Sequence, residues 1–110
     1  MSSPFVLLYG GNGWIGSQVY NLLVGMGIRV VKSCVRADNL EAVETEIGSF
    51  NKVTHVMSFI GRTHGTYKGE IISTIDYLEK PGKLVENMQD NLYAPIVLAS
   101  VCKKYGKHFT

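Results

Sequence analysis

The sequence has few cysteines and little imbalance of charge, and each shortage excludes a class of protein. Its 110 residues include two cysteines, Cys34 and Cys102, which lie far apart and form no Cys-x-x-Cys pair. A disulfide scaffold or a zinc site is therefore not indicated, and reduced thiols are typical of a cytoplasmic protein. The net charge is +2, with acids and bases interspersed. Neither nucleic acid nor an anionic membrane is therefore expected as a partner.

Long apolar runs are also missing. The apolar run that starts at Phe5 reaches glycine at Gly10, and residues 1–4 carry no basic side chain. Neither a signal peptide nor a membrane-spanning helix is therefore predicted. Apolar residues nevertheless make up 45% of the chain. That share and the length predict one folded domain over residues 1–110.

Strand-like and helix-like stretches alternate along the chain. Apolar, β-branched runs predict buried parallel strands at 5–9, from 30 to about 36, and at 54–60, and residues 108–110 resemble the start of a fourth. Apolar residues at steps of three and four predict helices between them. Their apolar faces are Ile15, Val19, Leu22, Leu23 and Met26 in the first, Leu40, Val43 and Ile47 in the second, and Leu84, Met88, Leu92, Ile96 and Ala99 in the third.

This alternation predicts an α/β sandwich of three layers around a parallel sheet, with right-handed crossovers. The expected strand order is 3-2-1, with the incomplete fourth strand belonging beside strand 1. Strand 1 would then leave an apolar edge unpaired, which proteins normally avoid. The pattern therefore favours the N-terminal part of a longer protein, or a chain that pairs this edge with a partner.

A glycine-rich turn follows the first strand. Gly11-x-Gly13-x-x-Gly16 has the dinucleotide-binding spacing, and Gly10-x-x-Gly13-x-x-Gly16 fits a variant of it. In this motif one glycine makes the turn, Gly13 lets a pyrophosphate approach the backbone, and Gly16 lets the helix pack closely. A phosphate-binding P-loop is excluded, because Ser17 stands where the lysine is required. The motif lies between a strand and a helix, which predicts a Rossmann-like domain rather than a merely structural turn.

The residues about twenty positions later normally contact the adenosine ribose. This chain has Arg36 there, with Asp38 just beyond. A cation accepts the 2′-phosphate of NADP, so Arg36 favours NADP over NAD. Two alternatives remain open: Arg36 is simply a solvated side chain, and Asp38 caps the following helix.

The turn Gly-Gly-Asn-Gly-Trp-Ile-Gly at 10–16 resembles that of extended short-chain dehydrogenases/reductases, in particular their rhamnose branch. The runs at 57–65 and 73–79 are similar to those of viral UDP-4-keto-6-deoxyglucose 3,5-epimerase/4-reductases, and plant UDP-rhamnose synthases share a weaker pattern. The resemblance runs along the whole chain but corresponds only to the front portion of a family member. It implies a reductase that uses NADPH or NADH to convert a UDP-linked 4-keto-6-deoxy sugar towards UDP-rhamnose.

The resemblance also implies roles for individual residues. By position, the pyrophosphate would be held by Gly10, Gly13, Trp14, Ile15 and Gly16. Arg36 would lie by the adenosine ribose, and Glu46 or Ile47 near the adenine. The cofactor would be flanked by Phe59, Ile60 and Gly61. Each apolar member of this set has packing in the core as an equally good explanation.

Asn91 matches the family's helix asparagine, which helps to organise the catalytic proton relay. Pro95 lies four residues later and has no N–H to donate to the Asn91 carbonyl, so the helix is expected to bend there. A solvent-exposed asparagine beside a harmless kink is the alternative. Thr63 and His64 follow the third strand, where ligands bind in open α/β sheets, and are candidate contacts for a nucleotide-sugar substrate. No spacing pairs the histidines as metal ligands, so no metal is predicted.

The chain departs from the family at its catalytic pair. The reductase chemistry requires a tyrosine followed four residues later by a lysine, whose charge lowers the phenol pKa. The tyrosines at 9, 20, 67, 77, 93 and 105 are followed at that spacing by Gly13, Val24, Ile71, Pro81, Val97 and Phe109. The chain is therefore expected to be inactive alone. The alternatives are a non-catalytic dinucleotide-binding module that pairs with another chain, possible homodimer formation included, and a purely structural domain.

Overall fold

A computed structural model describes residues 3–60, 65–67, 70–72, 85 and 88–110 of the chain. Strands and helices alternate in it as the sequence predicts. In chain order they are β1 (Phe5–Tyr9), α1 (Trp14–Gly25), β2 (Arg29–Lys32), α2 (Leu40–Ser49), β3 (His55–Ser58), β4 (Gly65–Tyr67), β5 (Glu70–Ile72), η2 (Gln89–Tyr93), α4 (Ala94–Tyr105) and β6 (His108–Phe109). The predicted α/β class is confirmed.

The main sheet is parallel, and its order is β2-β1-β3-β6. The predicted order 3-2-1 is therefore wrong, because the third strand lies beside β1 and β6 pairs with β3. Right-handed crossovers permit both orders, so handedness alone could not decide between them. Burial decides: all five residues of β1 are buried. Strand β2 has an exposed Arg29 and a half-buried Lys32, which suit an edge.

This order also removes the unpaired apolar edge expected at β1, which has a neighbour on each side. The edges of the described sheet are β2 and β6. A second sheet was not predicted: within the segment expected to be a polar loop, β4 and β5 pair antiparallel. The edge at β1 consequently gives no reason for a partner chain.

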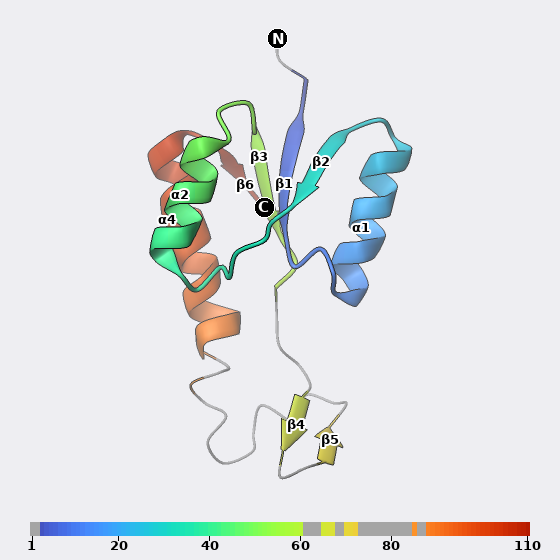
Figure 1. Cartoon of the computed structure of the whole chain (residues 1–110), viewed down its shortest axis with the longest axis vertical. Coiled ribbons are helices and arrows are strands. Elements are labelled where there is room, and N and C mark those ends of the chain that lie inside the picture. Colours follow the sequence, from blue (N-terminus) through green and yellow to red (C-terminus); the bar gives the residue numbers. More distant parts are fainter. Residues whose placement is uncertain (1–2, 61–64, 68–69, 73–84, 86–87) are drawn as a thin grey trace.

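The helices cover the two faces of the sheet unequally, with α1 on one side and α2 together with α4 on the other (Figure 1). The core lies on the α2/α4 side. Its fully buried large side chains include Leu7, Tyr9, Val43, Ile47 and Leu98. An ion pair between Glu44 and Lys104 joins α2 to α4 at the surface. Among the described residues, the main apolar cluster therefore lies on the face that α2 and α4 cover.

Helix α1 does not bury the apolar face predicted for it. Its buried residue is Gly16, while Ile15, Leu22 and Met26 are exposed. Val19 and Leu23 are half-buried. The period of the pattern predicts the helix correctly, but in the part of the chain that the structure describes no second layer covers its outer side.

The predicted third helix is divided in two. Residues Gln89–Tyr93 form the π-helical turn η2, and α4 begins at Ala94 with Pro95 in its first turn. A proline lacks the N–H that an α-helix needs four residues after Asn91, and a π-helical turn is one way to adapt to this. The apolar face shifts accordingly. Helix α4 buries Ala94, Val97, Leu98, Val101 and Cys102, whereas Met88, Leu92 and Ile96 are exposed; Leu84 lies outside the described residues.

Candidate functional site

The strand order reverses at the carboxyl ends of β1 and β3. From β1 the chain crosses to β2 on one side, and from β2 it returns past β1 to β3 on the other. The helices of these two connections cover opposite faces of the sheet. In open α/β sheets, ligands bind outside the carboxyl ends of the strands where the order reverses in this way. The glycine turn leaves β1 at this point.

Two of the glycines are required by the fold itself. Gly10 has a φ of +76°, and a Cβ there would lie 2.8 Å from the carbonyl carbon of Phe59. A Cβ on Gly16 would lie 1.9 Å from the Gly10 carbonyl oxygen. Side chains rarely tolerate either situation. These contacts bring the glycine turn, the start of α1 and the exit of β3 together.

Gly13 is different, because the fold alone does not require a glycine there. It has an extended backbone with φ −74° and ψ 174°. A Cβ would meet the Gly10 carbonyl oxygen at 3.5 Å, an ordinary van der Waals contact. The absence of a side chain therefore leaves open space in front of the helix.

That space faces an uncapped helix N-terminus. Gly13 is the N-cap of α1, no side chain caps the helix, and its first turn has no acidic residue. The Gly13 N–H donates to the Gly10 carbonyl at 3.2 Å, and the first helical bond runs from the Ser17 N–H to the Gly13 carbonyl. The amides of residues 14–16 precede that bond and have no acceptor among the described residues. Such amides and the helix dipole favour an anion.

The first two side chains of α1 are exposed and do not pack over the start of the helix. Trp14 is 82% exposed and Ile15 is 55% exposed. The Ser17 hydroxyl and the Gln18 amide both donate to the Trp14 carbonyl rather than to the amide groups at the start of the helix. An anion could therefore approach the turn from solvent without displacing a packed side chain.

Lys32 adds a cation that was not predicted from the sequence. Its ammonium donates to the Asn12 side-chain oxygen at 3.2 Å and lies 4.5 Å from the Tyr20 ring centre. The end of β2 is thereby tied to the glycine turn. The available signal was a lysine directly after the apolar pair Val30-Val31, but the sequence alone could not place it against Asn12.

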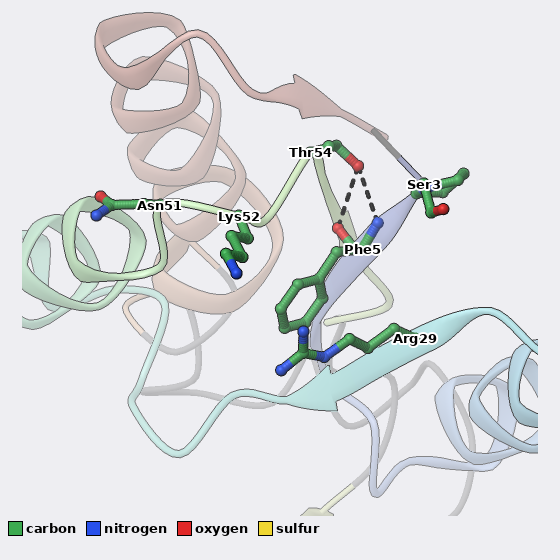
Figure 2. A pocket seen from close by; sticks show the side chains of 7 residues that line it. Ser3, Phe5, Arg29, Asn51, Lys52 and Thr54 are labelled. Atoms are coloured by element: carbon green, nitrogen blue, oxygen red, sulfur yellow. Dashed lines mark hydrogen bonds between the residues drawn. The ribbon is translucent and has the colours of Figure 1, made fainter. Parts of the chain in front are cut away.

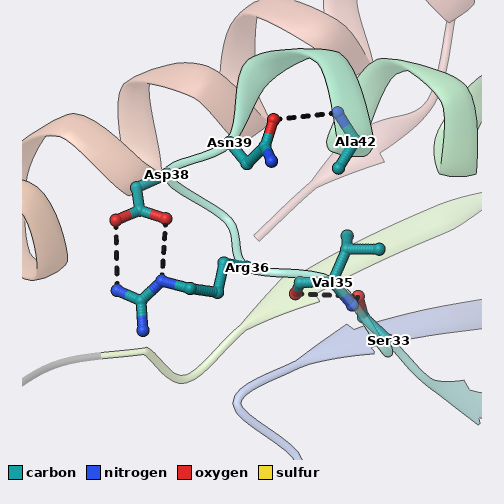
Figure 3. A network of polar contacts seen from close by, with 6 residues as sticks. All are labelled: Ser33, Val35, Arg36, Asp38, Asn39 and Ala42. Atoms are coloured by element: carbon teal, nitrogen blue, oxygen red, sulfur yellow. Dashed lines mark hydrogen bonds and ion pairs between the residues drawn. The ribbon is translucent and has the colours of Figure 1, made fainter.

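The connection from β2 to α2 holds the predicted ribose residue in an ion pair (Figure 3). Arg36 donates from Nε and Nη2 to the two carboxylate oxygens of Asp38, at 3.0 and 3.1 Å. The pair holds the pKa of Asp38 below its usual value, chiefly through the hydrogen bond from Arg36. Asp38 does not cap the helix: Asn39 is the N-cap and accepts from the Ala42 N–H at 3.1 Å.

Glu46 accepts three hydrogen bonds at the start of this connection. Tyr9 and Ser33 donate their hydroxyls to one carboxylate oxygen, each at 2.6 Å, and the Cys34 N–H approaches the other at 3.4 Å. Burial, followed by the bond to Glu46, raises the pKa of the Tyr9 phenol. Glu46 thus fixes the exit of β2. Tyr9 and Ser33 were not predicted as its partners, because the contacts join strands and a helix that are distant in sequence.

Of the two residues predicted near the adenine, Ile47 is corrected. It is fully buried in the core against the sheet and has no exposed surface for a ligand. Glu46 is half-buried and remains at the carboxyl edge.

The exit of β3 lies where it was expected. The Phe59 N–H donates to the Tyr9 carbonyl at 3.0 Å, which extends the pairing of β3 with β1 into the turn. Ile60 is half-buried against the core. The remaining residues predicted here, Gly61, Thr63 and His64, lie outside the described residues.

Asn91 lies in η2 and is exposed. The break in the helix that Pro95 predicted is confirmed, and its geometry is a π-helical turn. Turns of this kind are frequent at functional sites.

A different pocket, of about 460 Å³, lies at the amino ends of the strands (Figure 2). Two of its polar side chains, Thr54 and Arg29, contact Phe5 at the start of β1. The Thr54 hydroxyl accepts from the Phe5 N–H at 3.0 Å and donates to the Phe5 carbonyl at 3.3 Å. The Arg29 guanidinium lies 4.2 Å from the Phe5 ring centre. This pocket is therefore explained by the packing of the strand ends.

Two wider searches of the described residues are negative. None of their helices is long and apolar enough to cross a membrane. In the same ranges no group of three or more histidine, cysteine, aspartate or glutamate side chains is arranged to hold a metal ion.

Comparison with known proteins shows similarity to a viral protein. No family model matches the chain. The chain is 54% identical over 104 residues to the uncharacterised protein L780 of Acanthamoeba polyphaga mimivirus, covering 94% of this chain and 34% of that protein. The crystal structure of L780, described as a UDP-rhamnose synthase, has a TM-score of 0.89 at 51% identity, covering 98% of this chain and 36% of that one.

More distant structures share the fold. The dTDP-4-dehydrorhamnose reductase of Bacillus anthracis, solved with NADP, has a TM-score of 0.76 at 14% identity and covers 99% of this chain and 35% of its own. The Bordetella bronchiseptica enzyme WbmG, solved with NAD and UDP, has a TM-score of 0.70 at 18% identity and covers 96% and 36%. The chain thus spans about a third of the length of the proteins it matches.

The fold, the reversal of strand order and the glycine turn define a Rossmann-like domain. The similarity to L780 extends over nearly the whole of this chain and agrees with the resemblance read from the sequence.

Proposed function

We propose that this chain is the cofactor-binding part of an NADP-dependent nucleotide-sugar epimerase/reductase, which converts UDP-4-keto-6-deoxyglucose towards UDP-rhamnose. The observation that carries the proposal is the open, uncapped start of α1 in front of Gly13. The 54% sequence identity between this chain and L780, whose structure is described as a UDP-rhamnose synthase, supports the proposed substrate class.

In this proposal the chain binds and orients the dinucleotide. The amides of residues 14–16 donate to the pyrophosphate, and Gly13 leaves the space for it. Gly10 and Gly16 hold the turn against the exit of β3, so that Phe59, Ile60 and Gly61 flank the cofactor. Arg36 lies by the adenosine ribose and Glu46 on the adenine side. When bound, the dinucleotide supplies the hydride for reduction.

The substrate side of the proposal depends on residues with less structural support. Asn91 would organise the proton relay, and its place in a π-helical turn beside Pro95 is compatible with that role. Thr63 and His64 would contact the nucleotide sugar, on sequence grounds alone. The chain contains no Tyr-x-x-x-Lys, so by itself it is proposed to bind cofactor without turnover. A cytoplasmic location and a possible homodimer remain predictions.

Lys32 also favours phosphate binding, in addition to the amides, because its ammonium donates a hydrogen bond to Asn12 within the glycine turn. The choice of NADP over NAD rests on Arg36. A second candidate function is a non-catalytic dinucleotide-binding module, which the same site geometry supports.

Titration of the purified chain with NADPH, NADH and ADP-ribose tests the proposal. All three share the pyrophosphate, so each is expected to raise the melting temperature in a concentration-dependent way. Unchanged melting with all three would leave only a structural role for the turn. Expression of the chain together with the reading frame that continues it would separate the enzyme from the module. A downstream Tyr-x-x-x-Lys and reduction of the UDP-linked keto sugar would support the enzyme.

A further inference from the structure

We propose that His55 and His108 form a binding site for a divalent transition-metal ion of the zinc class, at the amino ends of β3 and β6. The inference goes beyond the proposed function and does not depend on it, because the glycine turn leaves β1 at the opposite, carboxyl end. The two histidines are partners in register on neighbouring parallel strands, and their ring centres lie 5.2 Å apart. Sequence spacing did not pair these residues, whereas the strand register brings them together.

The separation of the two rings suits a shared metal ion. Histidine nitrogens bind zinc at about 2.0–2.1 Å, which places each ring centre about 3.2 Å from the metal. Two such rings in a tetrahedral arrangement have centres about 5 Å apart. The planes of the rings are inclined by 54°, so the rings are not stacked on each other. Ordinary aromatic contacts span similar distances, and the hydrogen bonds around His55 therefore provide the second argument.

His55 has the outer partner that is typical of a metal-binding histidine. Its Nδ1 lies 2.7 Å from the Thr54 hydroxyl oxygen. That oxygen can accept the Nδ1 proton, because the hydroxyl's own proton has the Phe5 carbonyl as its acceptor, at 3.3 Å. Metal-ligating histidines usually donate their other ring N–H in this way, which fixes the orientation of the ring. In this tautomer, Nε2 of His55 carries the lone pair that a metal requires.

The pair is accessible from solvent. Residues in register on parallel strands share one face of the sheet. Along this row, Val6 is buried, His55 is half-buried and His108 is exposed, so the row opens towards the edge strand β6. The adjacent cation Lys107 is engaged elsewhere, because its ammonium donates to two main-chain carbonyls just after α2.

The site has two protein ligands. In the part of the chain that the structure describes, no third histidine, cysteine or carboxylate joins the pair. Water would therefore complete the coordination, and the affinity should be well below that of a structural site with four protein ligands.

Calorimetric titration of the full chain with zinc chloride, after purification without a histidine tag, tests the proposal. We expect one zinc ion per chain and a melting temperature that rises with zinc concentration, because the pair exists only in the folded state. His108→Gln and His55→Gln should each weaken zinc binding about tenfold or more. Thr54→Val should weaken it about tenfold, whereas Thr54→Ser, which keeps the hydroxyl, should bind as the original chain does.

Cys34→Ser and His64→Gln are matched controls, because both remove a zinc-binding side chain outside the pair. Cys34 is an exposed thiol, and His64 lies outside the described residues. Each control variant should keep its zinc affinity within about twofold. Zinc binding that survives His108→Gln, or that is lost in either control, would overturn the proposal, and so would the absence of zinc binding in the original chain. Should His55→Gln fail to fold, the exposed His108 still provides the test.

Discussion

Helices α1 and α2 begin at the same edge of one sheet, yet they differ in whether a side chain of the protein accepts hydrogen bonds from their first N–H groups. Helix α2 is capped by its own Asn39 and has Glu41 in its first turn. The preceding connection pairs Arg36 with Asp38. Helix α1 begins at a glycine, with no capping side chain and no acid. The positive N-terminus of α1 is therefore left for an anion from solvent. The N-terminus of α2 has a cap and an acid from the protein itself.

This difference is informative because both helices share one chain, one solvent and one fold. A helix start without a cap costs about 1 kcal/mol relative to one with a cap. The chain keeps that cost at α1, which begins where the strand order reverses, and avoids it at α2. We infer that the missing cap of α1 is a feature of the binding site, and the following predictions test the contrast in order of expected effect.

The largest effect is expected at Gly16, where α1 approaches the turn most closely. Gly16→Ala places a Cβ 1.9 Å from the Gly10 carbonyl oxygen, so the helix must move. We expect a loss of about 3 kcal/mol in the free energy of unfolding, measured by urea denaturation. Gly25→Ala is the matched control in the same helix, because a Cβ there has open space; it should be neutral or slightly stabilising. Equal stability of the two variants would contradict the close approach.

Gly13→Val should weaken cofactor binding strongly and lower the stability of the fold only slightly. Its Cβ makes only ordinary contact with the protein, but its methyl groups would occupy the space kept for the pyrophosphate. We expect at least a hundredfold rise in the dissociation constant of NADPH, equivalent to about 2.7 kcal/mol, with a loss of stability below about 1 kcal/mol. Retained affinity would refute the role of this space.

Gly13→Asn gives α1 the cap that α2 already has. An asparagine side chain can accept from the amides at the helix start, so stability should rise by a few tenths of a kcal/mol. The same amides would then be less available to phosphate, and NADPH affinity should fall about tenfold. A variant that is more stable and also binds NADPH as tightly as the original would break the contrast between the two helices.

Asn39→Ala removes the cap of α2 and is the reciprocal change. We expect it to lower the free energy of unfolding by about 1 kcal/mol, because the Ala42 N–H loses its acceptor. Cofactor affinity should stay within about twofold, since this helix start is not assigned to phosphate. A loss of affinity as large as that of Gly13→Asn would mean that both helix starts contribute to the site.

The smallest effect concerns pH. The pKa of Asp38 is lowered in the folded chain by Arg36, so the pair contributes stability above the unfolded pKa, near 3.9. That contribution is lost as the pH falls through the lowered value. Because Arg36 is largely exposed, it should amount to less than about 1 kcal/mol. The stabilities of the original chain and of Asp38→Asn should therefore converge in acid, and a difference that grows there would contradict the pair.

The sequence could predict what depends on local pattern. The strands of the main sheet, the helices between them, the α/β class, the glycine turn and the helix break before Pro95 all follow from periodicity, glycine spacing and a missing N–H. It could not predict the strand order, since right-handed crossovers allow β3 on either side of the first two strands. Nor could it show that the π-helical turn η2 changes which residues of the following helix face the core.

The same limit applies to the site. Gly10, Gly13 and Gly16 were found from spacing, but the sequence did not reveal that the fold requires only two of them. The contacts of Tyr9 and Ser33 with Glu46, and of Lys32 with Asn12, join residues that are 12 or more positions apart. The burial of Ile47 depends on which face α2 covers, and this follows from the strand order rather than from the helix itself.

Amide chemical shifts in a ¹⁵N-labelled chain titrated with ADP-ribose test the phosphate site most directly. The largest changes are expected at the amides of Trp14, Ile15 and Gly16, with little change at the start of α2 or around the pocket at Arg29 and Thr54. Unshifted amides at residues 14–16 in the presence of saturating ligand, or changes centred on either of the other two regions, would contradict the account.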